Sequence, residues 1–250
     1  MLYSGKSITI ERLENGIVEL CFNLQGQMVN IFNAQTLSEL SNAGIVLSTD
    51  KSIKGLLVTS AKTSFIVGAD ISEFDNNFSH IEATIVQGMM ENHQVFNAIE
   101  DLPFPTISLI NGLALGGGLE MALACDYRIM ATVARVGLPE VKLGIFPGFG
   151  GTVRMSRLIG ADNAIEWIAS GKEYKALAAL NAGVVDAMVE PEQLRASGLM
   201  MLEQCIAGKL NYQKKRQEKI QPLKLAQFES ILAFESAKGF IAGQSGPHYP

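Results

Sequence analysis

The sequence has few of the residues that bind metals or act as nucleophiles. Only three cysteines and three histidines occur among its 250 residues. Cys21, Cys125 and Cys205 lie far apart and form no C-x-x-C pair, and the scattered histidines give little support to a zinc site or a Ser–His–Asp triad. Widely spaced cysteines are typical of a reduced protein, so we expect a cytoplasmic location and no metal site.

Charged residues are also scarce, at 18% of the chain, and the formal net charge is −5. This balance argues against a nucleic acid as partner. Residues 102–125 carry a single charge, Glu120, but Pro103, Pro105 and several glycines interrupt this apolar stretch. Residues 1–7 lack the apolar centre of a signal peptide. We therefore expect a buried core segment here and no membrane insertion.

Several common catalytic and nucleotide-binding motifs are missing. The sequence contains no P-loop and no G-x-S-x-G elbow. A dinucleotide-binding G-x-G-x-x-G pattern would need glycine at Met121. At 48% hydrophobic residues, the chain is long enough to bury the core of one large domain, with or without an appendage.

Apolar periodicity predicts strands that alternate with helices. The expected strands are residues 8–13, 17–22, 55–59, 106–110, 127–131 and 184–189, and the expected helices are residues 34–47, 81–99, 161–169 and 177–182. Glu14, Asn15 and Gly16 join the first two strands as a hairpin. From about residue 192 onward the pattern is helical only, so the core is expected to be α/β.

The most informative stretch is residues 112–120, Gly-Leu-Ala-Leu-Gly-Gly-Gly-Leu-Glu. It follows an apolar strand and opens a helix, whose first turn has free N–H groups suited to a developing oxyanion. Glycines in a row are costly in backbone entropy unless something approaches the main chain closely. Glu120 lies in the same turn, where it could act as acid or base. The alternative is a tight turn in which Glu120 only favours the helix dipole.

A second carboxylate follows in a similar setting. Glu140 comes after Pro139 and before a second glycine-rich turn, residues 143–152, that leads into another helix. Alone, Glu140 could be a loop acid that caps the next element. Two glycine-rich loops with one glutamate each instead favour a pair that divides acid and base work. A third loop, Gly68-Ala69-Asp70, follows a strand, where sheet proteins usually bind ligands. For Asp70 itself we expect a capping role near Ile71.

Three blocks in this order, residues 65–71, 105–126 and 137–152, resemble the enoyl-CoA hydratase/isomerase (crotonase) family over roughly residues 8–189. More narrowly, residues 65–70 and 214–250 resemble the amino-terminal part of bacterial multifunctional fatty-acid-oxidation α-subunits, in which a dehydrogenase part follows the hydratase. No G-x-G-x-x-G follows here, so we expect an amino-terminal portion of a longer protein. The resemblance implies a spiral of repeated β-β-α units and a thiolase subunit as partner; a homo-oligomer is also possible.

The resemblance also implies the reaction and its residues. An acyl-CoA is the expected substrate, coenzyme A being part of it, and no separate cofactor is expected. Glu120 and Glu140 match the family's two catalytic glutamates, with Glu120 favoured as base and Glu140 as acid, although the roles could be exchanged. The thioester oxygen is expected at the N–H groups of Ala69 and Gly117. The remaining expected substrate-binding residues are Gly68, Gly116, Asp70 and Ile71.

Hydration of a trans-2-enoyl-CoA in β-oxidation is the function that this pattern favours. Isomerisation between Δ3 and Δ2 enoyl-CoA needs only one base, so the two glutamates make it the alternative or a side activity. A catalytically idle docking domain is the third reading, and nothing in the sequence favours it.

The last part of the chain is expected to differ from the rest. We expect a crotonase domain at residues 1–190, then a helical segment and the start of a linker at residues 191–250, with a turn-rich end at residues 246–250. Residues 209–224 carry six basic residues and one acid, typical of a solvated face, with contact to a phosphate-bearing ligand as the alternative. Apolar residues around 222–241 predict a helix packed on the core, so that deleting residues 224–250 would destabilise the protein.

Overall fold

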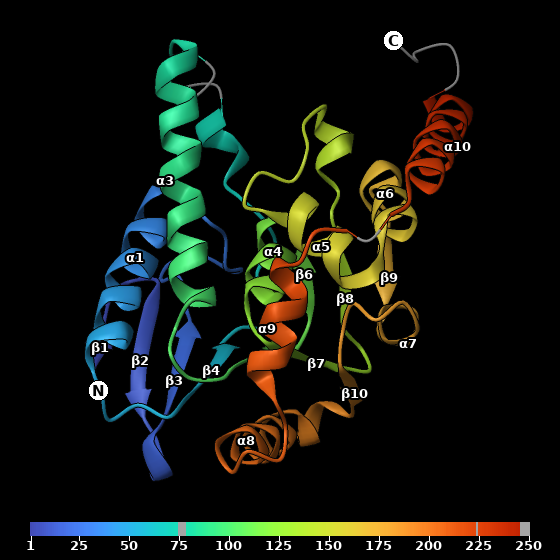
Figure 1. Ribbon diagram of the computed structural model, residues 1–250. Coiled ribbons are helices and arrows are strands. Elements are labelled where there is room, and N and C mark those ends of the chain that lie inside the picture. Colours follow the sequence, from blue (N-terminus) through green and yellow to red (C-terminus); the bar gives the residue numbers. More distant parts are fainter. Residues whose placement is uncertain (75–78, 224, 246–250) are drawn as a thin grey trace.

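The computed structural model describes the whole chain except residues 75–78, 224 and 246–250. The expected turn-rich end at residues 246–250 therefore lies outside the described residues. Figure 1 shows a mixed α/β molecule in which strands run through the centre and helices surround them. This confirms the fold class expected from the alternating pattern.

The larger sheet has seven strands in the order β1-β2-β3-β4-β5-β7-β10. Their bounds are β1 Tyr3–Ser4, β2 Ile8–Arg12, β3 Ile17–Phe22, β4 Gly55–Ser60, β5 Thr106–Ile110, β7 Tyr127–Ala131 and β10 Ala187–Val189. The β2–β3 hairpin is antiparallel, as predicted, and Asn15 in its turn has a positive φ of 59°. From β3 onward every neighbouring pair is parallel.

A smaller sheet of three strands, in the order β6-β8-β9, was not predicted from the sequence. These strands are β6 Leu113–Leu115, β8 Arg135–Gly137 and β9 Glu173–Lys175. They are only three residues long and have no apolar alternation, so only their long-range pairing defines them. Strands β6 and β8 run parallel and bring the two glycine-rich segments side by side.

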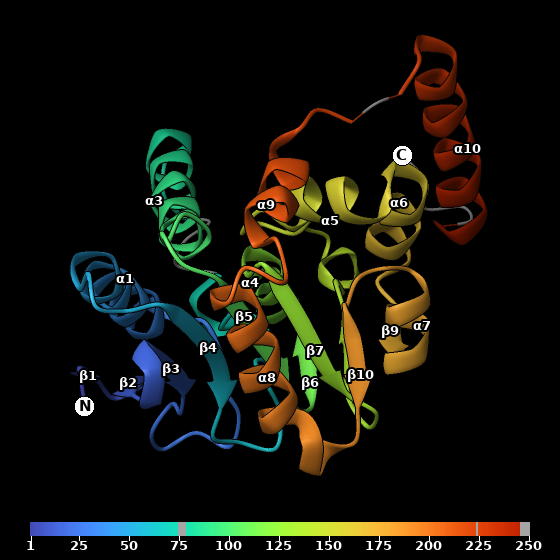
Figure 2. The same ribbon diagram turned by 60° about the horizontal axis from the view of Figure 1, so that its bottom comes forward.

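The described helices lie around the strands (Figures 1 and 2). They are α1 Ala34–Thr49, α3 Glu82–Glu100, α4 Gly117–Ala124, α5 Gly151–Ile159, α6 Ala161–Ser170, α7 Ala176–Asn181, α8 Leu194–Ile206, α9 Tyr212–Ile220 and α10 Gln227–Ser245, with short 3-10 turns at Glu14–Gly16, Ile71–Glu73, Glu140–Leu143 and Pro191–Gln193. Every residue of β5 is buried, so both of its faces are covered. Helix α8 packs on β4, β5 and β7, and α4 packs on β5 and β7 (Figure 2).

The basic run of residues 209–224 is not simply a solvated face, and that interpretation is wrong for three of its members. On α9, Lys215 pairs with Asp186, Arg216 Nε lies 2.6 Å from Asp126 Oδ1, and Lys219 Nζ lies 2.7 Å from Glu100 Oε1. Lys219 is only 7% exposed. Acidic groups far away in the sequence attract these cations inward, which a local charge count cannot reveal.

The end of the chain forms the predicted helix but not the predicted packing. Helix α10 lies against α6 at the periphery of the molecule (Figures 1 and 2). Its side chains Phe228 and Phe234 are 70% and 62% exposed, and Ile231 and Leu232 are about half exposed. The helix packs beside α6 and not on the sheet, so few of its apolar side chains become buried.

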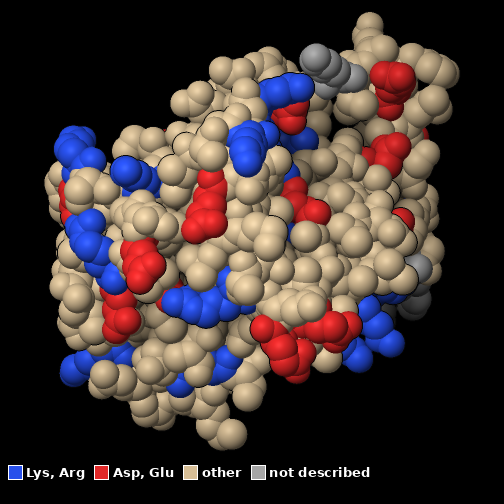
Figure 3. All heavy atoms as spheres, turned by 90° about the horizontal axis from the view of Figure 1, so that it is seen from below, with Lys and Arg blue, Asp and Glu red and all other residues tan. Residues whose placement is uncertain are grey.

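The surface carries charges of both signs. Figure 3 shows Lys and Arg side chains interspersed with Asp and Glu over the face seen from below, without a broad area of one sign. Among the described residues, no helix is long and apolar enough to cross a membrane.

Candidate active site

The loop after β4 lies directly against β6 and the start of α4. Phe65 N donates to Leu113 O at 2.9 Å, and Leu115 N donates to Ile66 O at 3.0 Å. A Cβ on Gly118 would lie 2.0 Å from Ile66 O, closer than real atoms approach. Glycine is therefore required at position 118 because the two segments are in backbone contact.

Two further glycines turn the chain toward a common point. Gly68 has a φ of 108° and Gly116 a φ of 52°, both in the region that favours glycine. A Cβ on Gly116 would lie 3.7 Å from the Gly68 Cα and 3.0 Å from Glu140 Oε1. The Gly68 loop, the Gly116 turn and the Glu140 carboxylate thus meet within a few ångströms.

Two backbone N–H groups at this point are free to bind a ligand oxygen. Gly117 is the first residue of α4, so its N–H has no acceptor within the helix. Ala69 bridges to Phe32, but there Phe32 N donates to Gly68 O and Asp70 N donates to Phe32 O, both at 2.8 Å. Within the described part of the chain, neither the Ala69 nor the Gly117 N–H donates a hydrogen bond. Together with the positive end of α4, they form a suitable site for an oxyanion.

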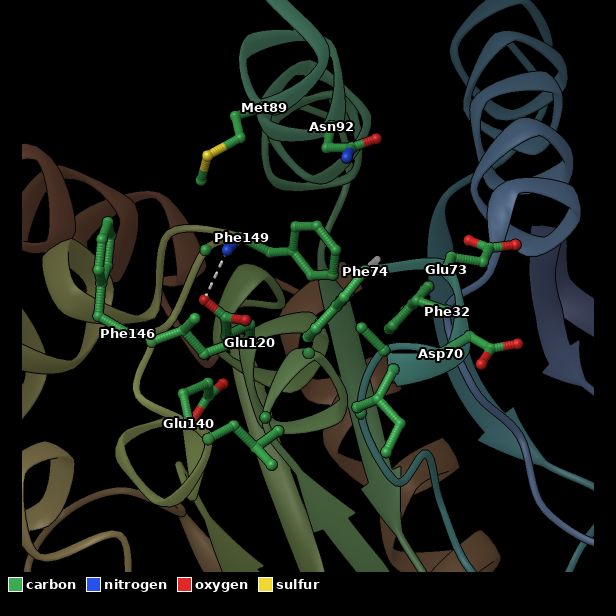
Figure 4. A pocket seen from close by; sticks show the side chains of 18 of the residues that line it. Phe32, Asp70, Glu73, Phe74, Met89, Asn92, Glu120, Glu140, Phe146 and Phe149 are labelled. Atoms are coloured by element: carbon green, nitrogen blue, oxygen red, sulfur yellow. Dashed lines mark hydrogen bonds between the residues drawn. The ribbon is translucent and has the colours of Figure 1, made fainter. Parts of the chain in front are cut away.

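Glu120 is fixed by the second glycine-rich turn. Its side chain is almost completely buried, and Oε1 accepts a hydrogen bond from Phe149 N at 2.8 Å (Figure 4). The same oxygen accepts a second hydrogen bond from Gly151 N at 2.7 Å. A Cβ on Gly151 would lie 2.9 Å from the Glu120 side chain. The loop that begins α5 is therefore shaped around this carboxylate.

Glu140 approaches from the opposite side of the same space. It follows β8 and opens a 3-10 turn, and in Figure 4 its carboxylate extends toward that of Glu120. Among the described residues its buried Oε2 has no hydrogen-bond partner. The capping role considered for Glu140 is wrong for the next helix, because α5 has Gly150 at its N-cap and no side-chain capping hydrogen bond.

Both carboxyl groups are harder to ionise than usual. Burial raises the pKa of Glu120 to about 7, the negative charge of Glu140 adds to the increase, and the Gly151 and Phe149 amides oppose it. Burial also raises the pKa of Glu140 to about 6. Between these two values the pair carries one proton, the state in which one group is an acid and the other a base.

Asp70 lies at the edge of this space without facing the glutamates (Figure 4). Asp70 Oδ1 accepts from Ser72 N at 3.0 Å, so it caps the short turn as expected from the sequence. Figure 4 shows the Asp70 side chain pointing away from Glu120 and Glu140. Ile71 is largely exposed.

One cavity of about 620 Å³ unites these residues, a size typical of small-molecule sites. All eight residues singled out from the sequence line it: Gly68, Ala69, Asp70, Ile71, Gly116, Gly117, Glu120 and Glu140. The structure adds an apolar wall that the sequence did not reveal. It consists of Phe32, Met89, Phe146 and Phe149, with Asn92 beside Met89 on α3 (Figure 4). Phe146 and Phe149 lie within the second glycine-rich turn, whereas no local motif marks Phe32 and Met89. Met89 comes to the cavity on α3, and Phe32 through its backbone contact with Gly68.

The fold and this cavity bring two backbone N–H groups beside two carboxyl groups, an arrangement suited to an enzyme that stabilises an oxyanion. A sequence model of the family described as enoyl-CoA hydratase/isomerase matches residues 12–235. The chain therefore belongs to the enoyl-CoA hydratase/isomerase family. This confirms the resemblance drawn from the three sequence blocks.

Curated relatives narrow the comparison. Over all 250 residues the chain is 59% identical to the fatty acid oxidation complex subunit alpha of Pseudomonas putida strain F1, and 58% identical to that of Pseudomonas syringae pv. tomato. In each case it covers 35% of the relative, so the chain spans about a third of the length of these proteins.

Solved structures agree on the fold. An enoyl-CoA hydratase from Bacillus anthracis is 28% identical, with a TM-score of 0.75 and coverage of 96% of both chains. A second, from Geobacillus kaustophilus, is 27% identical with a TM-score of 0.79 and coverage of 96% of this chain and 90% of the other. The expected crotonase-like architecture is thereby confirmed.

Proposed function

We propose that this chain adds water across the 2,3 double bond of trans-2-enoyl-CoA thioesters in fatty-acid β-oxidation, using Glu120, Glu140 and a backbone oxyanion hole. The observation that carries the proposal is the meeting of two buried carboxyl groups and two free N–H groups in one cavity. Hydration needs both kinds of group, because the carboxyl groups transfer protons and the N–H groups stabilise an enolate-like oxygen.

The N–H groups of Ala69 and Gly117 would receive the thioester oxygen. When water adds to C3, negative charge develops on that oxygen, and donors already in place stabilise it without reorganisation. Loss of a single such donor costs roughly 10²–10³ in rate in other enzymes. The positive end of α4 strengthens the same effect.

The two glutamates would divide the proton transfers. As the C3–O bond forms, one carboxylate accepts a proton from the water, and the other carboxyl group gives a proton to C2. We assign Glu120 as the base, because two amide donors stabilise its carboxylate, and Glu140 as the acid, because its buried Oε2 has no donor. The pKa values favour the opposite order, since Glu120 at about 7 holds a proton more tightly than Glu140 at about 6, so the two roles could also be exchanged.

The substrate would supply its own activating group. Hydration produces no net oxidation or reduction, so the reaction requires no redox cofactor, and coenzyme A belongs to the substrate. The aromatic side chains Phe32, Phe146 and Phe149 offer an apolar wall to an acyl chain.

Isomerisation between Δ3 and Δ2 enoyl-CoA is the second candidate function. It uses the same oxyanion hole but only one base, so the paired glutamates favour hydration with isomerisation as a side activity. An idle docking domain is disfavoured, since the cavity keeps both carboxyl groups and both donors.

The wider setting is also part of this proposal. The relatives' names and lengths support a place within a longer subunit of a fatty acid oxidation complex. The resemblance drawn from the sequence implies that this place is the amino-terminal part and that a dehydrogenase part follows. A thiolase subunit is the partner proposed for such a protein, and association of several copies is also possible. A reducing, cytoplasmic location accords with three free cysteines.

Incubation with crotonyl-CoA tests the proposal directly. Hydration removes the conjugated enoyl group, so its absorbance should fall with time in proportion to the amount of protein. Incubation with a 3-enoyl-CoA reports isomerisation, because that reaction creates the conjugated group. A protein that isomerises but does not hydrate would contradict the assignment, and one that does neither would support the docking alternative.

A further inference from the structure

A row of charged side chains connects helix α9 to the loop that holds Glu120. Lys219 Nζ on α9 lies 2.7 Å from Glu100 Oε1, at the end of α3. Glu100 Oε2 in turn lies 2.8 Å from Nη2 and 2.9 Å from Nε of Arg154 on α5. Three segments that are distant in the sequence are thus joined by buried or nearly buried charges.

The Arg154 end of this row reaches the immediate support of Glu120. Arg154 Nη1 donates to Phe149 O at 2.8 Å, and Nη2 donates to Asn97 Oδ1 at 2.8 Å. The amide of the same Phe149 donates to Glu120 Oε1. Arg154 therefore binds the carbonyl of Phe149, while Glu120 binds the amide of the same residue. A change in the Arg154 guanidinium would shift this amide, which orients the Glu120 carboxylate.

The Lys219 end supports the helix that carries the site. Lys219 Nζ donates to Ala124 O at 3.3 Å and to Cys125 O at 3.2 Å, at the carboxyl end of α4. A cation at that end complements the helix dipole. The first turn of the same helix carries Gly117 and Glu120.

We infer that Arg154 is a positioning residue for Glu120. Arg154 is in turn oriented by Glu100, which pairs with Lys219. This inference rests on the proposed function, because it assigns a role within that reaction. Arg154 acts on the Phe149–Gly151 loop by direct hydrogen bonding and on the Glu120 carboxylate by charge. Among the described residues, Glu140 and Arg154 are the charged groups with the largest effects on Glu120: Glu140 raises its pKa and Arg154 lowers it.

Replacement of Arg154 separates these effects from a purely structural one. Arg154→Gln should lower kcat for crotonyl-CoA by roughly 10- to 100-fold, since small misplacements of a catalytic group have effects of this size. KM should stay within about twofold, because neither oxyanion donor is touched. The alkaline side of the kcat–pH profile should move to higher pH, because loss of the cation raises the pKa of Glu120, which is already the higher of the two glutamate pKa values.

Two companion variants sharpen the test. Arg154→Lys retains the charge but cannot reproduce the forked contacts of guanidinium, so it should restore the pH profile while part of the kcat loss remains. Arg157→Gln removes the same charge from the same helix at an exposed site whose contact is to Lys219 O, away from the Phe149 loop. It should leave kcat and the pH profile unchanged.

The outcomes distinguish the inference from the proposed function. A wild-type protein that does not hydrate crotonyl-CoA would overturn the proposed function and this inference with it. A hydrating wild type with unchanged kcat and pH profile in Arg154→Gln, and only a lower melting temperature, would overturn the inference alone. If Arg154→Gln does not fold, Arg154→Lys decides: reduced kcat at the wild-type pH profile supports the positioning role, and wild-type kcat overturns it.

Discussion

Glu120 experiences opposing influences. Burial removes the water that would stabilise its charge, while the amides of Phe149 and Gly151 supply two hydrogen bonds to the ionised form. Burial has the larger effect, so the carboxyl is harder to ionise than an exposed one. A general base or acid works best when its pKa lies near the working pH. These influences bring the pKa of Glu120 close to neutral pH.

The paired carboxyl groups predict how hydration depends on pH. The reaction requires one ionised and one neutral glutamate, whichever carries the proton. With pKa values of about 6 for Glu140 and about 7 for Glu120, this state is most populated between those values. We expect a bell-shaped profile of kcat/KM with crotonyl-CoA, falling at lower pH as both groups bind protons and at higher pH as both lose them. A flat profile across this range would contradict the pairing.

Replacement of Glu120 is expected to stabilise the protein at alkaline pH. Because the pKa of Glu120 is raised from 4.5 to about 7 in the folded state, the group favours folding below pH 4.5 and loses that contribution as pH rises through 7. Glu120→Gln removes the cost of a buried charge, at most on the order of 3 kcal/mol for this shift. Thermal melts should show a higher melting temperature for the variant at pH 8 and a much smaller difference at pH 5. A lower melting temperature at pH 8 would show that the two amide hydrogen bonds outweigh the burial.

Local sequence was sufficient to identify Glu120 and Glu140 but not what orients them. Each lies next to a recognisable glycine-rich segment, which Glu120 follows and Glu140 precedes, so much of their surroundings is encoded nearby. Arg154 and Glu100 lie 54 positions apart in the chain, and neither stands in a distinctive motif. Their contact depends on how α3 and α5 pack, which a single sequence does not specify.

Helix α4 positions an oxyanion donor and a carboxylate with one turn of backbone. Gly117 occupies its first position, where proline is compatible with helix geometry but has no N–H to donate. A Cβ at this position would lie 3.0 Å from the rings of Phe32 and Phe149, so some bulk is tolerated only if these rings shift slightly. Substitutions at position 117 can therefore test the loss of the N–H donor separately from the effect of added side-chain bulk.

Gly117→Pro should lower the kcat of hydration and of isomerisation alike, by roughly 10²–10³ for the lost donor. Both reactions pass through the same enolate-like oxygen, which explains the shared loss. Gly117→Ala keeps the N–H and is the matched control, and it should lose much less activity. Circular dichroism checks the fold of each variant. Isomerisation that survives in Gly117→Pro would contradict a common oxyanion hole.

Helices α9 and α10 should contribute very differently to stability. Removal of residues 224–250 takes away α10, whose apolar side chains are largely exposed, so the melting temperature should stay close to that of the whole chain. Removal of residues 211–250 also takes away Lys215, Arg216 and Lys219. This leaves buried Asp126 without its cation, and breaking such a pair costs about 3–5 kcal/mol.

Thermal melts of the two shortened proteins check this contrast. The shorter deletion also corrects the destabilisation expected from the sequence, where apolar spacing suggested a helix buried on the core. Equal melting temperatures for both deletions would show that the contacts of α9 do not support the fold.

The overall architecture was largely predictable because its signals are local. The hairpin, β5, β7 and the helices around the sheet arise from apolar spacing and turn residues within each segment. The three-stranded sheet and the inward charges of α9 depend on partners far along the chain. Sequence reasoning consequently identified the residues of the site but missed the supports behind them.

The central claim is that Glu120 and Glu140 share the chemistry of hydration in one cavity. It is tested most directly by the hydration rate of crotonyl-CoA in Glu120→Gln and Glu140→Gln, measured from the loss of enoyl absorbance together with acyl-CoA binding. Each variant should lose about 10²–10⁴ in kcat, the usual contribution of general acid–base catalysis, while binding changes little. Near wild-type turnover in either variant would contradict the paired-carboxylate mechanism.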